Sequence, residues 1–120
     1  MIRVLFVYDH EMVRIGVSAY LSAQPDIDVV GEADNGKRGV ELALSLRPDI
    51  ILMDLVMKEM DGIEATRRIK MKSAQIPVIV LSMYSEYRAA ALAAGANAFF
   101  IKGEPAERLL AVLLAICSTN

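Results

Sequence analysis

Short apolar runs rich in valine and isoleucine alternate along the chain with longer segments of helical character. The apolar runs predict strands over Ile2–Tyr8, Val29–Ala33, Ile50–Asp54, Val78–Ser82 and Ala98–Ile101. The segments between them predict helices over Glu11–Ala23, Lys37–Leu46, Ile63–Lys72, Tyr87–Ala94 and Pro105–Ser118. Several apolar runs are nearly continuous, which is typical of strands that are covered on both faces. The sequence therefore predicts a parallel sheet between two layers of helices.

With five strand–helix repeats, the expected architecture is a flavodoxin-like three-layer α/β/α fold. Its five-stranded parallel sheet would have the order 2-1-3-4-5 and five helices around it. The chain has 120 residues, which fits one domain over residues 1–120. In this fold the functional crevice lies beyond the carboxyl ends of strands 1 and 3, where the winding direction of the sheet reverses.

Charge and composition narrow the possible partners and location. The 13 basic and 15 acidic residues give a net charge of -2, so we expect no direct contact of this domain with nucleic acid. The longest uncharged runs, Ser73–Ser85 and Ala89–Ile101, are shorter than the about 20 residues of a membrane helix. The first residues do not resemble a signal peptide, and one cysteine cannot form an internal disulfide. These features favour a cytoplasmic protein without membrane contact.

Four side chains of suggestive chemistry follow four of the predicted strands. They are Asp9, Asp54, Ser82 and Lys102. A charge at the tip of a buried strand is costly unless it is paired or bound to a cation, and two neighbouring carboxylates favour a hard ion such as Mg²⁺. A carboxylate nucleophile with a cation, a lysine and a hydroxyl beside it suits phosphoryl transfer.

Each of these residues also has an ordinary structural interpretation. A single Asp after a strand is often a helix cap or turn residue, and a single Ser or Lys at a strand end is often only solvated. The combination on one predicted sheet edge is what favours a site. Other enzymes of this fold fit less well, because YDHEMVRIG offers one late glycine for a phosphate cradle.

The sequence resembles the response-regulator receiver domains of two-component signalling, from about Arg3 to the end. The resemblance lies in VLFVYDHEMVRIG, DIILMDLVMKEMDGIEATRRIK, PVIVLS and AGANAFFIKGEP. The segment GEADNGKRGVELA and the pair Asp9-His10 are most similar to receivers of the NarL/FixJ type, which usually precede a DNA-binding output domain.

This resemblance implies that Asp54 is the phosphoacceptor of a sensor histidine kinase and that the protein catalyses only its own phosphorylation and dephosphorylation. It implies Mg²⁺ on Asp9, Asp54 and the backbone carbonyl of Val56. Ser82 and Lys102 would contact the phosphoryl group, and Phe99 matches the aromatic residue that rotates when the hydroxyl moves. Conformational switching would then control transcription through an output domain outside this chain.

Tyr8 departs from the family pattern, which usually has a second acid at this position. Its presence predicts weakened Mg²⁺ binding. It also leaves an alternative, a pseudo-receiver that acts as an interaction module without being phosphorylated.

The last predicted helix is apolar on almost every side between Leu109 and Ile116. A helix of this kind requires burial on more than one face. We therefore expect a partner on it, either a second copy in a homodimer or a downstream DNA-binding output domain.

Overall fold

The computed structural model describes residues 1–118, so Thr119 and Asn120 of the predicted domain lie outside the described residues. The strands are β1 (Ile2–Val7), β2 (Ile27–Ala33), β3 (Ile50–Asp54), β4 (Val78–Ser82) and β5 (Ala98–Ile101). The helices are α1 (Glu11–Ser22), α2 (Gly36–Leu46), α3 (Gly62–Lys72), α4 (Arg88–Ala93) and α5 (Ala106–Ser118). A short 3₁₀ turn, η1 (Ser85–Tyr87), precedes α4.

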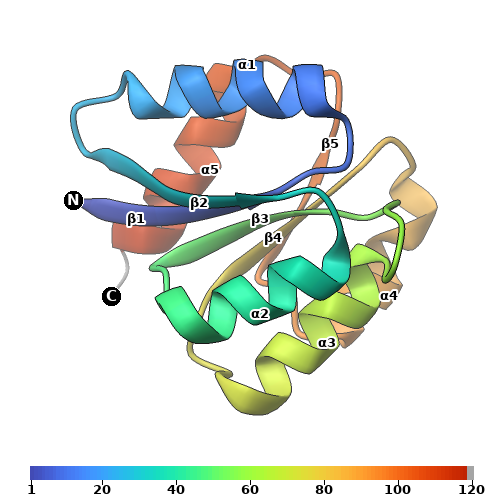
Figure 1. Cartoon of the computed structure of the whole chain (residues 1–120). Coiled ribbons are helices and arrows are strands. Elements are labelled where there is room, and N and C mark those ends of the chain that lie inside the picture. Colours follow the sequence, from blue (N-terminus) through green and yellow to red (C-terminus); the bar gives the residue numbers. More distant parts are fainter. Residues whose placement is uncertain (119–120) are drawn as a thin grey trace.

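The strands form one parallel sheet of order β2-β1-β3-β4-β5, as predicted. Figure 1 shows the helices on both sides of this sheet, with α1 and α5 on one side and α2 and α3 on the other. The change of direction between β1 and β3 leaves a crevice at their carboxyl ends. The predicted flavodoxin-like fold is thereby confirmed.

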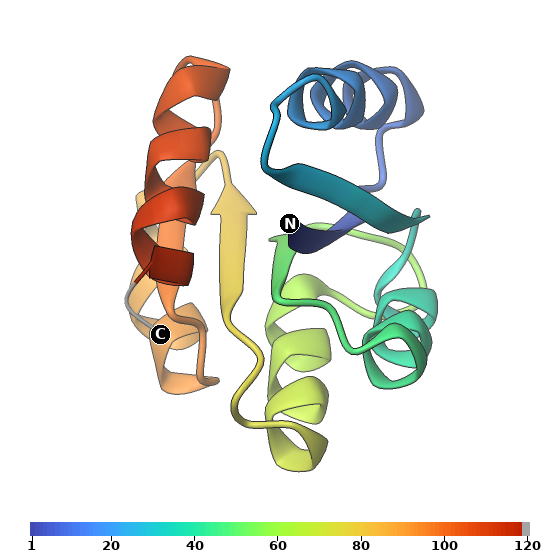
Figure 2. The same ribbon diagram turned by 90° about the vertical axis from the view of Figure 1, so that its left-hand side faces the viewer.

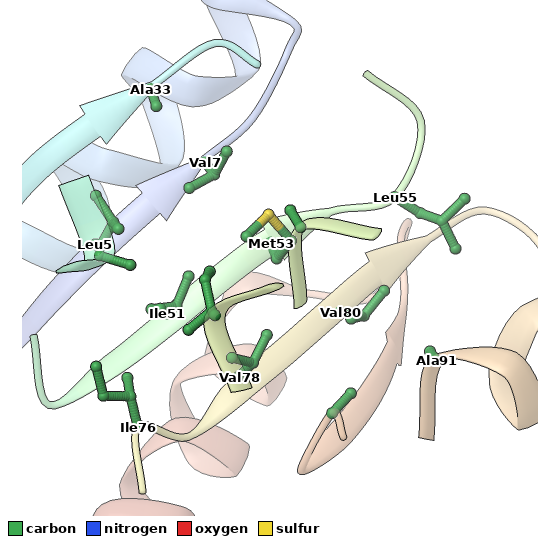
Figure 3. Close-up of a cluster of buried hydrophobic side chains, with 14 of the residues drawn as sticks. Leu5, Val7, Ala33, Ile51, Met53, Leu55, Ile76, Val78, Val80 and Ala91 are labelled. Atoms are coloured by element: carbon green, nitrogen blue, oxygen red, sulfur yellow. The ribbon is translucent and has the colours of Figure 1, made fainter. Parts of the chain in front are cut away.

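Two hydrophobic clusters hold the three layers together. In the cluster of Figure 3, strand residues such as Ile51, Met53 and Val80 pack toward α2, α3 and α4. On the other face, strand residues including Phe6 and Leu52 pack with Leu21 of α1 and Leu113 of α5. Figure 2 shows this layering from the side: β4 (yellow) lies between α5 (red) and α3. Burial on both faces explains why these strands lack alternation in the sequence.

Helix boundaries follow local hydrogen bonding. The side chains of His10, Asn35 and Asp61 cap α1, α2 and α3, each accepting from the backbone N–H three residues later. At the end of the α4 segment, Gly95 has φ of 109°, a conformation that glycine adopts without the steric cost of a Cβ.

The predicted boundaries lie within one residue of the observed ones except at the start of β2. β2 begins at Ile27 instead of Val29, because the buried Ile27 pairs with Ile2 while the exposed Asp28 interrupts the apolar run. The fourth helix begins at Arg88, since residues 85–87 form the tighter 3₁₀ turn.

Candidate functional site

An open cleft of about 460 Å³ lies at the carboxyl ends of β1 and β3. Its lining consists of Tyr8, Asp9, His10, Val13, Asp54, Val56, Met83 and Lys102. Strand ends and the loops that follow them supply most of this lining, so the parallel sheet itself brings together residues that are far apart in the sequence. Asp9, Asp54 and Lys102 meet here as the sequence predicts.

Asp54 is the most buried charged residue of the cleft, with 2% of its surface exposed. Its Oδ1 lies 2.5 Å from the Lys102 ammonium, and its Oδ2 accepts a hydrogen bond of 3.3 Å from the backbone N–H of Asp9. Within residues 1–118, this ammonium is the one polar group that contacts the buried Oδ1. The carboxylate therefore keeps unused capacity to accept a donor or a cation.

Lys102 lies between this carboxylate and an aromatic ring. Its ammonium is 4.5 Å from the centre of the Tyr8 ring, within the range of a cation–π interaction. Burial lowers the pKa of Lys102, but Asp54 and Tyr8 together outweigh that effect and hold the pKa above its ordinary value. The side chain is consequently a fixed positive charge at neutral pH. The Tyr8 ring covers this charge on one side.

The loop after β3 approaches the backbone of Asp54 very closely. A Cβ on Gly62 would collide with the carbonyl oxygen of Asp54, and the N–H of Gly62 donates to the carbonyl oxygen of Leu55 at 2.7 Å. Only glycine leaves room for α3 to begin directly against the end of β3. This contact fixes the backbone that carries Asp54.

Ser82 ends β4 as predicted, but its hydroxyl is turned to the following loop. The Oγ accepts a hydrogen bond of 3.0 Å from the N–H of Tyr84. Phe99 on β5 is 7% exposed, packs in the cluster of Figure 3, and has the Arg88 guanidinium 5.6 Å from its ring centre. Neither side chain is among those lining the cleft in the described part of the chain.

The oxygen donors of the cleft fit a hard cation that takes few ligands from the protein. Within residues 1–118, no three acidic, histidine or cysteine side chains gather into a metal cluster. The carboxylates of Asp9 and Asp54 remain as oxygen donors, which suit Mg²⁺ because this ion keeps several of its waters. The buried Oδ1 of Asp54, which Lys102 alone contacts within residues 1–118, is compatible with such an ion. His10 also lines the cleft, but its Nδ1 accepts a hydrogen bond of 3.3 Å from the N–H of Val13 at the start of α1.

Sequence reasoning missed two features of the site. The first is the position of Tyr8 against Lys102, which brings together the residues that follow β1 and β5, two strands that are not neighbours in the sheet. The second is Arg14, which donates to the backbone carbonyl of Tyr8 at 2.9 Å. An arginine within the first helix carries no local signal of such a contact.

A three-layer domain with this strand order and with paired acids and a lysine at its carboxyl edge is of the receiver class of signalling domains. The chain belongs to the response regulator receiver domain family, whose model matches residues 4–114.

Its relatives are response regulators. It is 53% identical over 105 residues to the response regulator protein VraR of Staphylococcus saprophyticus, covering 84% of this chain and 49% of that protein. It is 52% identical over 110 residues to VraR of Staphylococcus aureus, covering 88% of this chain and 52% of that protein. The chain thus spans about half the length of the curated relatives it matches.

Solved structures show the same fold. A two-component response regulator of the LuxR family from Aurantimonas sp. superposes with a TM-score of 0.94 at 30% identity, covering 100% of this chain and 87% of that one. The response regulator domain of Thermotoga maritima CheB gives a TM-score of 0.84 at 32% identity, covering 99% and 95%. None of the helices within residues 1–118 has the length and hydrophobicity needed to cross a bilayer.

Proposed function

We propose that this chain accepts a phosphoryl group on Asp54 from the phosphohistidine of a sensor histidine kinase. The observation that carries this proposal is the buried ion pair of Asp54 with Lys102 at the base of an open cleft. A carboxylate oxygen of Asp54 forms the new bond to phosphorus while the phosphorus–nitrogen bond of the donor breaks. Lys102 lies where it neutralises charge on the transferring oxygens. The protein catalyses only this phosphorylation and the hydrolysis of the aspartyl phosphate to the free carboxylate and inorganic phosphate.

Asp9, Asp54 and the backbone carbonyl of Val56 would hold Mg²⁺ in this site. When bound, the ion supplies positive charge to the transferring phosphoryl oxygens. Tyr8 brings no carboxylate to the cleft, so we expect the Mg²⁺ affinity to be lower than in a site with three acids. Asp9 is exposed and free to turn toward a cation, while Asp54 is held in place by its burial.

The switch in our proposal involves Ser82 and Phe99. The Ser82 hydroxyl now accepts a hydrogen bond of 3.0 Å from the N–H of Tyr84. It gives up this hydrogen bond to reach a phosphoryl group on Asp54. In this switch Phe99, which is 7% exposed and packs in the core that includes Ala91 of α4, moves toward the place that the hydroxyl leaves. A few kcal/mol of differential contact is enough to shift such an equilibrium. The surface of α4, β5 and α5 then changes shape.

Residues 1–120 form the receiver part of a cytoplasmic transcriptional regulator in this proposal, with a DNA-binding output domain outside the chain. The length of the relatives supports it, because this chain covers 49% of one VraR. The last helix supports a partner, since Leu109 and Leu113 are buried whereas Leu114 on its outer side remains 38% exposed. A second copy or the output domain would cover that side. Sedimentation at several concentrations, with and without phosphodonor, would detect the homodimer.

The deciding experiment is incubation with acetyl phosphate over a Mg²⁺ titration, followed by intact-mass measurement. We expect a mass gain of one phosphoryl group that requires Mg²⁺ and disappears in Asp54→Asn. No gain in the wild-type protein would instead support the pseudo-receiver, in which Tyr8 has ended phosphorylation. An equal gain in Asp54→Asn would place the phosphoryl group on another residue.

A further inference from the structure

The peptide unit between Tyr8 and Asp9 is held at both of its ends. Its carbonyl oxygen accepts a hydrogen bond of 2.9 Å from Nη1 of Arg14, and its N–H donates to Oδ2 of Asp54 at 3.3 Å. A peptide unit is planar, so the direction of its carbonyl fixes the direction of its N–H. The Arg14 contact therefore determines how the N–H of Asp9 is aimed at the Asp54 carboxylate.

Arg14 is itself fixed by a second set of contacts. Its Nε lies 3.3 Å from Oε1 of Glu32 on β2, and the other carboxylate oxygen of Glu32 accepts from Ser18 at 2.9 Å. Arg14 and Ser18 are four residues apart on α1 and so lie on the same side of the helix. The Arg14 side chain is 16% exposed, well below the exposure of an ordinary surface arginine such as Arg38, at 57%.

The guanidinium group is suited to this double role. It is planar and donates in two directions from fixed positions, which lets one group bind a carbonyl and a carboxylate together. A lysine at the same place offers a single ammonium and cannot hold both partners in the same geometry. The contact is also charge-assisted, which strengthens the hydrogen bond to the Tyr8 carbonyl.

We propose that Arg14 is a positioning residue of the phosphoacceptor site. It acts through the Tyr8–Asp9 peptide unit, aligns the N–H of Asp9 on Asp54, and keeps the Asp9 carboxylate at the mouth of the cleft. Glu32 and Ser18 orient Arg14 in turn. The inference about phosphorylation rests on the proposed function, whereas the alignment of the Asp9 N–H does not.

The first measurement is the amide resonance of Asp9 in ¹H–¹⁵N spectra. In the wild-type background, Asp54→Asn is expected to shift this resonance, because it changes the acceptor of the Asp9 N–H. In Arg14→Gln the response to Asp54→Asn should fall to less than half. The matched control is Arg38→Gln, which removes an exposed arginine paired with Glu41 at 3.2 Å, and it should leave the response unchanged.

The second measurement is the rate of phosphorylation by acetyl phosphate at a fixed Mg²⁺ concentration. Arg14→Gln should slow it about tenfold, the size of effect common for groups that orient the residues of a site. Arg14→Lys should lie between Arg14→Gln and wild type. Glu32→Gln should give a smaller loss of its own and add little to Arg14→Gln, since both act through the same contact.

Two results would overturn the inference. One is an Asp9 amide response in Arg14→Gln equal to that of the wild type, and the other is a rate within twofold of the Arg38→Gln control. If the wild-type protein is not phosphorylated at all, the proposed function fails while the amide response still decides the role of Arg14. If Arg14→Gln does not fold, Arg14→Lys and Glu32→Gln provide the same comparison.

Discussion

Replacing Lys102 with methionine tests the energetic role of the central ion pair. The change keeps an unbranched apolar side chain and removes the ammonium that lies 2.5 Å from Oδ1 of Asp54. The Asp54 side chain is 3% exposed, so the change removes the main compensating charge from a largely buried carboxylate. Oδ2 retains the hydrogen bond of 3.3 Å from the N–H of Asp9.

The expected loss in the free energy of unfolding depends on how deeply Asp54 and Lys102 are buried. Breaking a fully buried pair by removing one partner costs about 3–5 kcal/mol. The Lys102 side chain is 21% exposed and faces an open cleft, so water can approach the space that it leaves. We therefore expect a loss of about 2 kcal/mol in the free energy of unfolding at pH 7 without Mg²⁺. At an m-value of about 2 kcal/mol/M, the urea midpoint falls by about 1 M.

Urea unfolding with a chelator present measures this loss, and two further variants show its origin. Lys37→Met removes an exposed lysine from α2 and should change stability by less than about 0.5 kcal/mol. Asp54→Asn combined with Lys102→Met replaces the unpaired carboxylate with a neutral amide. This double variant should regain about half or more of the loss, because no buried charge remains uncompensated.

The reasoning is refuted by either of two outcomes. A loss as small as that of Lys37→Met would mean that the ammonium contributes nothing to holding Asp54 in the fold. A double variant no more stable than Lys102→Met would mean that the loss comes from packing of the lysine stem and not from the carboxylate.

Two further predictions concern the same edge of the sheet. Gly62→Ala should destabilise the domain by about 3 kcal/mol in urea unfolding, because its Cβ meets the Asp54 carbonyl oxygen. Gly16→Ala on α1, where a Cβ meets nothing within 4 Å, should instead leave stability unchanged or raise it by about 0.5 kcal/mol, and equal losses in both would contradict this reasoning. Because the pKa of Lys102 is raised in the folded state, its contribution is fully present below the ordinary value of 10.5 and is lost as the pH rises through the higher folded value. Unfolding curves from about pH 9 to 11.5 should therefore converge for wild type and Lys102→Met, and a constant gap would argue against the pair.

The architecture was predictable because its signals are local and repeated. Continuous apolar runs such as Ile50–Asp54 mark strands buried on both faces, and the strand-helix alternation leaves few ways to connect them. Errors arose where local signals conflict. The charged Asp28 interrupts the apolar run, so the predicted strand began too late. Pairing with β1 nevertheless buries Ile27 and makes it the first residue of β2.

The sequence predicts which residues lie near one another in the site but not where their side chains point. Parallel strands end at one edge, so Asp9, Asp54 and Lys102 were expected to meet, and they do. The directions of side chains are set by contacts between distant elements, which no local pattern encodes. The Ser82 hydroxyl therefore turns to the backbone of Tyr84, and Arg14 reaches the carbonyl of Tyr8.

The arrangement at Asp54 combines two opposing requirements. A buried carboxylate needs partners for the fold to tolerate its charge, yet a nucleophile needs an oxygen that is not fully engaged. Here the Lys102 ammonium is the one polar group within residues 1–118 that contacts Oδ1, and Asp9 gives Oδ2 one long hydrogen bond. The fold thus compensates the charge through electrostatics and leaves hydrogen-bonding capacity unfilled. In the proposed function, such a carboxylate can still bind a cation or form the bond to phosphorus while the fold tolerates its charge.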